Sequence, residues 1–227
     1  MQLTARLFAR LTQIGYMPPL KATRAFSEAG FIVKQQSPSR CTQEWYRLEL
    51  PNGDISFLIF PGSKTVADWC RNVEIKPCYS LTPFGMLHAG FVGNVAENMS
   101  PIGDILKPTY FIGHSAGGAA AAIVASQFSQ IAFGVYGFGT PKFCDPTWAR
   151  NYDSRLGDKT TFFENVDDVI PMLPPASRFT TPGATVRLGS ESASSQQLLN
   201  LLQGAYNLPR VLTGHDIQRY IERLPNE

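Results

Sequence analysis

The sequence is poor in the residues that metal and redox sites use. It has only three histidines and four cysteines, and Cys41, Cys70, Cys78 and Cys144 form no C-x-x-C pair. Zinc fingers and thiol redox motifs depend on such pairs, so we expect no metal site, and nothing in the sequence implies a cofactor. We interpret the cysteines mainly as buried thiols, with disulfides as the alternative.

Long runs of one charge or of apolar residues are also missing. The net charge is +2, with acidic and basic residues interspersed, so a nucleic-acid partner is not expected. Residues 110–128 are long enough to cross a bilayer, but His114 and several glycines interrupt them. We therefore expect no transmembrane segment.

The N-terminal residues lack the continuous apolar region of a secretory signal, because Arg6 and Arg10 interrupt it. We expect a cytoplasmic protein or one exported by a non-standard route. Apolar residues from Leu3 to Ile14 recur at helical spacing, which predicts an amphipathic helix packed on the core. Attachment of this helix to a membrane surface is the alternative.

Strand-like and helix-like segments alternate along the chain. Predicted strands at 45–50 and 55–60 are joined by Pro51-Asn52-Gly53-Asp54, a strong hairpin signal. Further strands are predicted at 108–113, 132–139, 160–166 and 185–189, and helices at 67–75, 88–99, 116–129, 194–206 and 216–224. This order predicts an α/β fold with a mostly parallel central sheet and helices on both faces. The length suits one domain over residues 1–227.

The segment Gly113-His114-Ser115-Ala116-Gly117 matches the pattern G-x-S-x-G. A predicted strand runs directly into it, and an alanine-rich helix runs directly out. That setting is typical of a nucleophile elbow, a sharp turn that presents a strained serine near the N-terminus of a helix. A phosphate-binding turn is the alternative, but the G-x-G-x-x-G spacing and a P-loop lysine are absent.

A serine nucleophile needs a base, and only three histidines are available. His114 adjoins the serine, so its side chain should point away from the serine side chain. His88 precedes the serine in the chain. On a fold with this elbow the base follows both the serine and the acid, which leaves His215. A capping or surface role is the alternative for His215.

The acid should lie between the serine and His215, at the carboxyl end of a strand. Asp167 and Asp168 are favoured, since they leave the strand predicted at 160–166 and enter a proline-rich turn. Adjacent side chains point in different directions, and two carboxylates beside one imidazole would repel each other. The pattern alone does not decide between the two.

Five motifs together resemble the class 3 lipase family, the fungal-lipase-like branch of the α/β-hydrolases. They are FPGSKTVADW (60–69), HAGF (88–91), GHSAGGA (113–119), YGFGTPKFCD (136–145) and NVDDVIPMLPP (165–175). The resemblance covers about residues 45–224, with the motifs in the order of the family. Pro61, Ala116 and Ile170 replace a usual arginine, leucine and valine, and none of these changes removes a catalytic group.

The resemblance implies a serine hydrolase that cleaves esters of lipids or other carboxylic esters. Ser115 would be the nucleophile, Asp168 the acid and His215 the base. Backbone N–H groups of Ala116 and Ser63 would form the oxyanion hole, where preformed donors stabilise the developing charge. An ordinary turn or a helix N-cap is the alternative for Ser63, and capping is compatible with the oxyanion role.

A helix is predicted directly after Ser63, because Val66, Trp69, Cys70 and Val73 recur at helical spacing. Similar lipases carry a lid at this place. We hypothesise that its apolar face closes the site in water and opens during transient contact with a lipid surface. A fixed helix packed on the core is an equal alternative.

Other functions stay open on the same scaffold. Triad chemistry also permits a phospholipase A, a feruloyl-type esterase, an acyltransferase or a peptidase, since pocket shape sets the substrate. A non-catalytic ligand-binding domain is a further alternative, although such a domain has no use for three chemically matched groups.

Overall fold

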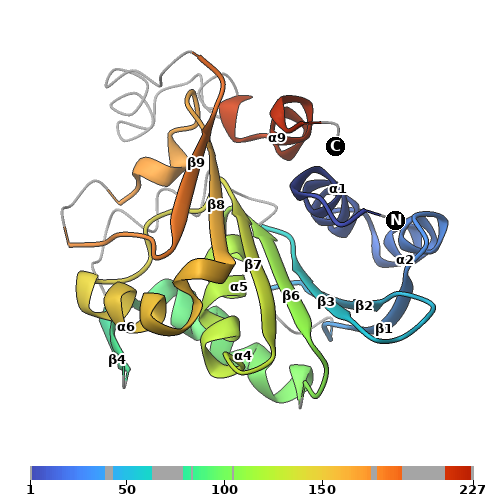
Figure 1. Ribbon diagram of the computed structural model, residues 1–227, viewed down its shortest axis with the longest axis horizontal. Coiled ribbons are helices and arrows are strands. Elements are labelled where there is room, and N and C mark those ends of the chain that lie inside the picture. Colours follow the sequence, from blue (N-terminus) through green and yellow to red (C-terminus); the bar gives the residue numbers. More distant parts are fainter. Residues whose placement is uncertain are drawn as a thin grey trace.

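The computed structural model describes residues 2–38, 43–62, 79–82, 84–103, 105–174, 178–190 and 213–225. Within them, seven strands form one sheet in the order β1-β2-β3-β6-β7-β8-β9 (Figure 1). Their bounds are Ile32–Gln36, Tyr46–Glu49, Ser56–Phe60, Thr109–His114, Ala132–Phe138, Thr160–Asn165 and Ala184–Leu188. A separate hairpin consists of β4 (Tyr79–Thr82) and β5 (Gly85–His88).

The sheet has an antiparallel and a parallel part. β1, β2 and β3 pair antiparallel, and the β2–β3 connection is the hairpin predicted at residues 51–54. From β3 to β9 every neighbouring pair in the sheet is parallel. The carboxyl ends of these parallel strands therefore meet at one edge, where ligand sites of α/β sheets usually lie.

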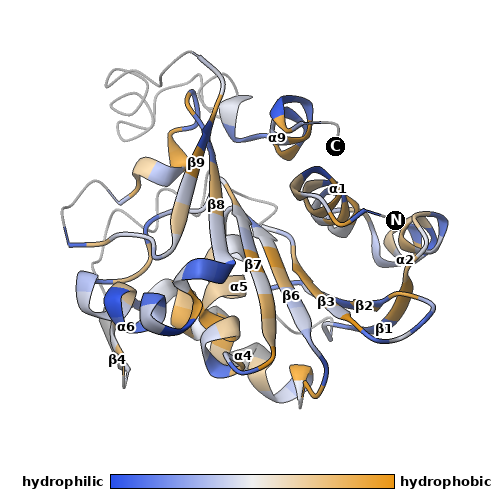
Figure 2. Cartoon of the chain, in the orientation of Figure 1, coloured by the Kyte–Doolittle hydropathy of each residue, from blue (hydrophilic) through white to orange (hydrophobic). Residues whose placement is uncertain are grey.

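Helices cover both faces of the sheet, as predicted. α1 (Ala5–Gly15), α2 (Pro19–Glu28) and α9 (Ile217–Arg223) pack on one face, and α4 (Ala89–Ile102), α5 (Ala116–Gln127) and α6 (Pro146–Leu156) on the other (Figure 1). Side chains alternate along β3, so Phe57 and Ile59 join the core under α1 while Leu58 joins the core under α5. Apolar residues line β6 and β7 (Figure 2).

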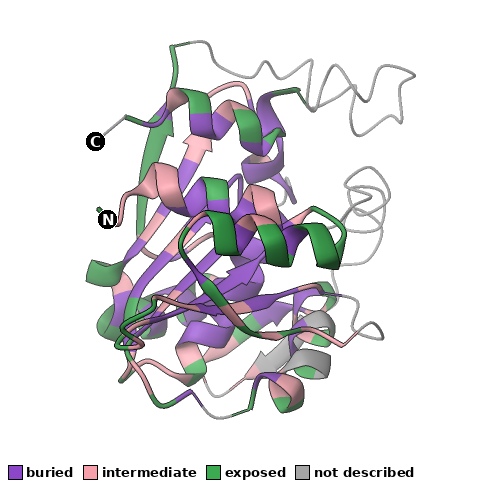
Figure 3. Ribbon diagram, turned by 90° about the vertical axis from the view of Figure 1, so that its right-hand side faces the viewer, coloured by how far each residue is buried: buried purple, intermediate pink, exposed green. Residues whose placement is uncertain are grey.

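The alanine-rich helix α5 is buried along most of its length. Every residue from Ala116 to Ala125 is buried, because α5 packs on β3, β6, β7 and α4. Buried residues follow the sheet and α5, whereas the outer helix surfaces are exposed (Figure 3). Small side chains allow this close approach, and it fixes the start of α5 relative to the strand ends.

Several sequence predictions need correction. The helix predicted at 88–99 runs on to Ile102 with Pro101 in its last turn, and the missing N–H of Pro101 affects only this end of the helix, because Ile102 alone follows it. β1, α2, α6 and the β4–β5 hairpin were not predicted. Helices predicted at 67–75 and 194–206 lie outside the described residues. Among the helices in the described part of the chain, none has the length and apolar character needed to cross a membrane.

Candidate active site

Ser115 occupies a sharp turn between β6 and α5. Among the described residues it is the only non-glycine residue with positive φ, at φ 56° and ψ −131°. A side chain with a Cβ is strained in this region, so the surrounding structure must enforce it. The Ser115 N–H donates to the Phe138 carbonyl at 2.8 Å, and the Gly118 N–H donates to the Ser115 carbonyl at 3.0 Å. The turn thus has the geometry of a nucleophile elbow.

The glycines that flank Ser115 make this turn possible. A Cβ on Gly113 would overlap the backbone of Gly117, and a Cβ on Gly117 would overlap the carbonyl of Phe60. The elbow therefore packs directly against the end of β3. Ala116 is the first residue of α5, where helix N–H groups lack carbonyl partners within the helix.

Asp168 and His215 meet at the same edge of the sheet. His215 Nδ1 lies 2.8 Å from Asp168 Oδ2, and their side chains are only 4% and 0% exposed. Because an ionised carboxylate only accepts hydrogen bonds, Nδ1 carries the proton and Nε2 is the basic nitrogen. Nε2 is buried and has no hydrogen-bond partner among the described residues. The imidazole is thus oriented at one nitrogen, while the other is available for proton transfer.

Asp167 points away from His215 and binds α9. It accepts hydrogen bonds from Arg223 at 2.5 and 3.1 Å and from Arg219 at 3.1 Å. Burial raises the pKa of the Asp167 carboxyl, but the hydrogen bonds and charge of Arg223, with help from Arg219, outweigh burial and lower the pKa overall. The structure therefore gives the two adjacent carboxylates different partners, a choice that the pattern alone left open.

Two further donors fix the Asp168 carboxylate. The Tyr220 hydroxyl donates to Oδ2 at 2.6 Å, and the Ile170 N–H donates to Oδ1 at 2.9 Å. Burial and the neighbouring carboxylate of Asp168 raise the pKa of Tyr220, so its hydroxyl stays protonated and remains a donor. Tyr220 was not among the predicted site residues, and its one signal in the sequence is its place on the predicted helix that follows His215.

The loop of His215 is held by contacts with the end of β8. His215 ends a short 3₁₀ turn, η3 (Thr213–His215), in which Gly214 packs so closely on the Asp167 backbone that a Cβ would overlap it. The Asn165 side chain donates to the Gly214 carbonyl at 2.8 Å. These contacts place His215 beside the turn that carries Asp168.

The other two histidines, His114 and His88, each have hydrogen bonds of their own. The His114 ring stacks on the His215 ring, with 4.6 Å between the ring centres. Its Nε2 lies 2.8 Å from the His215 carbonyl oxygen and its Nδ1 lies 2.6 Å from the Tyr16 hydroxyl. Burial and the nearby His215 lower the pKa of His114, which is therefore neutral. His88 accepts a hydrogen bond from the Gly90 N–H at the start of α4.

Five of the predicted site residues fall in one stretch that follows β3. Ser63, together with Val66, Trp69, Cys70 and Val73 of the predicted lid, lies outside the described residues. Gly62 is described and lies against the elbow, because a Cβ on it would come 2.8 Å from Ser115 Cβ. Of the cysteines only Cys144 is described, and it is a buried free thiol whose pKa burial raises. In the described ranges no three His, Cys, Asp or Glu residues gather as a metal site would require.

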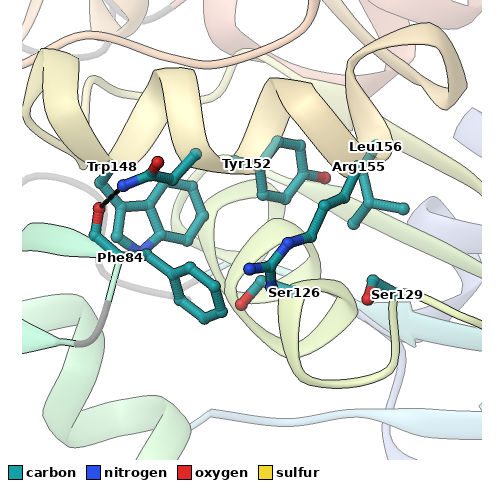
Figure 4. Close-up of a pocket in the computed structure, with 8 residues that line it drawn as sticks. Phe84, Ser126, Ser129, Trp148, Tyr152, Arg155 and Leu156 are labelled. Atoms are coloured by element: carbon teal, nitrogen blue, oxygen red, sulfur yellow. Dashed lines mark hydrogen bonds between the residues drawn. The ribbon is translucent and has the colours of Figure 1, made fainter.

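A gap between α5 and α6 lies away from this edge (Figure 4). Its lining includes Phe84, Trp148, Tyr152 and Arg155, and the Arg155 guanidinium lies 4.3 Å from the centre of the Phe84 ring. The volume is about 10 Å³, which holds at most one water molecule. The gap is therefore a packing feature and not a substrate site.

The chain resembles known proteins in sequence and in fold. A family model described as Lipase (class 3) matches residues 57–178. A triacylglycerol lipase, whose catalytic centre is described as a serine protease triad, superposes with a TM-score of 0.67 at 17% identity, over 82% of this chain and 79% of that chain. The Yarrowia lipolytica LIP2 lipase gives 0.67 at 16% identity, over 82% and 79%. Lipase II of Rhizopus niveus gives 0.63 at 19% identity, over 83% and 78%. No curated protein is similar enough in sequence to match this chain.

Proposed function

This chain belongs to the class 3 lipase family and has the α/β-hydrolase fold, and we propose that Ser115, His215 and Asp168 are its catalytic triad. Family membership makes it a serine carboxylic ester hydrolase that acts on lipid esters. We propose in addition which residues catalyse the reaction and which esters the enzyme prefers.

The observation that carries the proposal is the buried hydrogen bond between Asp168 and His215. When His215 accepts a proton, its ring becomes positive inside a buried site, where an unpaired charge is costly. Asp168 stabilises that charge from 2.8 Å and holds Nδ1, which leaves Nε2 as the nitrogen that can accept the proton. Hydrogen bonds from Tyr220 and Ile170 keep the carboxylate in place during this change.

The reaction proceeds in two halves. Ser115 Oγ attacks the ester carbonyl carbon while His215 Nε2 takes its proton, and the tetrahedral intermediate then expels the alcohol, which receives that proton. Water attacks the resulting acyl-enzyme in the same way, with His215 again as base. Cleavage of the Ser115 ester bond releases the carboxylic acid and restores the serine.

The negative charge on the substrate oxygen needs preformed donors. We assign one to the Ala116 N–H, which follows the nucleophile at the start of α5, where the helix dipole also favours a negative charge. We assign the other to Ser63, which follows Gly62 in the loop after β3. The contact of Gly62 with Ser115 supports this assignment.

Replacement of the nucleophile tests the triad. Purified S115A protein should not hydrolyse nitrophenyl esters above background and should not react with a fluorophosphonate probe. S126A is the matched control, because Ser126 lies on the same helix and its hydroxyl bonds only local groups: it donates to the Ile123 carbonyl at 2.7 Å and accepts from the Gln127 side chain at 3.3 Å. Labelling of S115A, or loss of labelling in S126A, would disprove the assignment of Ser115.

A panel of nitrophenyl esters with acyl chains of increasing length tests the lipid preference. A lipase should prefer long chains, whereas preference for short or aromatic acids would indicate a feruloyl-type or general esterase. Release of one acyl chain from a phospholipid would indicate a phospholipase A.

Rates below and above the solubility limit of one ester test the proposed lid at Val66, Trp69, Cys70 and Val73. Without a rise in rate at the interface, the fixed helix is the correct interpretation.

A further inference from the structure

Tyr16 reaches the candidate active site from the opposite end of the chain. It follows α1, about a hundred positions before Ser115, yet its hydroxyl oxygen lies 2.7 Å from the Gly62 nitrogen and 2.6 Å from His114 Nδ1. Gly62 directly precedes Ser63, the proposed oxyanion residue, and His114 directly precedes Ser115. One hydroxyl group therefore touches both loops on which the proposed chemistry depends.

The protons in this network have one consistent arrangement. His114 Nε2 lies 2.8 Å from the His215 carbonyl oxygen, and because a carbonyl only accepts, Nε2 must carry the proton. His114 Nδ1 is then an acceptor, so the Tyr16 hydroxyl donates to it and accepts from the Gly62 N–H. Burial lowers the pKa of His114 and raises the pKa of Tyr16, so both groups stay neutral and the arrangement persists.

We propose that Tyr16 is a positioning residue for ester hydrolysis, which joins the backbone at Gly62 to the backbone of His215 through the His114 ring. The inference rests on the proposed function, since it assumes that Ser63 and His215 act in the reaction. Gly62 is the neighbour in sequence of Ser63, the proposed oxyanion residue, and the His215 carbonyl belongs to the same residue as the proposed base. The network thus connects the residue before the proposed oxyanion residue to the backbone of the proposed base.

The Tyr16 hydroxyl is not needed to hold α1 in the fold. Phe8 and Leu11 already bury α1 against the sheet. Arg6 donates to the Leu224 carbonyl at 3.2 Å, and Gln13 bonds Gln218 at 2.9 Å, which joins α1 to α9. Removal of one hydroxyl group should therefore leave α1 in place and change only the local positions of Gly62 and His114.

Y16F is the test, with Y152F as the matched control. The Tyr152 hydroxyl is also buried and hydrogen-bonded, to Thr160 at 2.9 Å, but it lies on α6 away from the site. Misplacement of a catalytic group by about 1 Å costs roughly a hundredfold, so Y16F should lower kcat about ten- to a hundredfold with little change in KM. Y152F should change kcat by less than about twofold, although it also removes a buried hydrogen bond and should lower the melting temperature.

A double-mutant cycle tests whether Tyr16 acts through His114. H114Q places an amide donor where Nε2 reaches the His215 carbonyl, but it removes the acceptor for Tyr16. If the network acts as one unit, Y16F/H114Q should lose less activity than the product of the two single losses. In ¹⁵N spectra of the wild type, His114 should carry its proton on Nε2.

These outcomes separate the inference from the proposed function. Loss of activity in S115A together with equal kcat values for Y16F and Y152F would overturn the positioning role and leave the triad intact. A loss in Y16F confined to KM, multiplicative losses in the cycle, or a proton on His114 Nδ1 would overturn it as well. Should Y16F fail to fold, two other measurements decide the question. They are the ¹⁵N spectrum of wild-type His114 and the kcat of H114Q, calculated per active site titrated with the fluorophosphonate. A proton on His114 Nδ1, or an unchanged kcat in H114Q, would overturn the positioning role.

Discussion

Replacement of Asp167 with asparagine should loosen the attachment of α9 to the turn that carries Asp168. Asp167 accepts three hydrogen bonds from Arg219 and Arg223, two of them from the Arg223 guanidinium. The asparagine amide keeps one acceptor oxygen and the volume of the side chain, so the variant removes the charge without a cavity. The Asp168–His215 pair is left intact, so stability is expected to change more than chemistry.

The size of the effect follows from burial. Hydrogen bonds to charged groups contribute about 1.5–3 kcal/mol, and fully exposed ion pairs only about 0–1 kcal/mol. The Asp167 and Arg223 side chains are 13% and 20% exposed, while Arg219 is 43% exposed. We therefore expect D167N to lower the free energy of unfolding by about 1–2 kcal/mol at pH 7. In a protein of this size that corresponds to a fall of about 2–8 °C in Tm.

The dependence on pH identifies the cause. Because the pKa of Asp167 is lower in the folded than in the unfolded protein, the unfolded state binds more protons as the solution becomes acidic. The stabilisation is complete above the unfolded pKa, near pH 4, and disappears as the pH falls through the folded pKa. The difference between wild type and D167N should therefore shrink below about pH 4.

Urea unfolding followed by tryptophan fluorescence measures this difference, with E164Q as the control. Burial is the main cause that raises the pKa of Glu164, so its charge opposes folding above the folded pKa, and E164Q should leave stability unchanged or increase it at pH 7. A D167N difference that stays constant to pH 3.5, or an equal loss in E164Q, would refute the ionic explanation.

Other consequences can be measured on the same preparations. The pKa of His114 is lowered by burial and by His215, so the imidazole binds a proton more readily in the unfolded state than in the folded state. Wild-type stability should therefore fall below about pH 6.5, by up to about 1.4 kcal/mol per pH unit. In urea unfolding at several pH values, H114Q should lack this contribution to the slope. S115G should abolish hydrolysis but raise the free energy of unfolding by about 1 kcal/mol, because glycine relieves the positive φ; a loss of stability would mean that the turn is not strained. G117A should be destabilised and inactive, since its Cβ would overlap the Phe60 carbonyl, whereas G93A, with open space around it, should keep full activity; equal effects in thermal unfolding would contradict the packing argument.

The elbow could be predicted because it is a local feature. A strand, glycines at fixed spacing and a helix of small residues occur within about a dozen consecutive residues, and sterics alone require the glycines around Ser115. The prediction of His215 as the base rested on chain order and on the small number of histidines. The choice between Asp167 and Asp168 needed the family resemblance, since it depends on a turn whose direction the pattern does not encode.

Elements without a strong periodic pattern were missed. β1 is an edge strand with alternating exposed and half-buried residues, so its sequence IVKQQ shows no buried face. α6 has a low proportion of apolar residues, and it is fixed by the cap at Asp145 and by buried Trp148 and Tyr152. Such elements are stabilised by tertiary contacts, which override weak local preferences.

The two tyrosines of the site have no signature in the sequence because their partners are distant along the chain. Tyr220 on α9 bonds Asp168, and Tyr16 after α1 bonds His114, while α1 and α9 lie side by side on one face of the sheet (Figure 1). Each hydroxyl accepts from one backbone N–H and donates to one side chain beside His215. α9 thus contacts His215 through Tyr220 and Asp168, and the residue after α1 contacts it through His114. The position of His215 therefore depends on both terminal helices and not only on the sheet that presents Ser115.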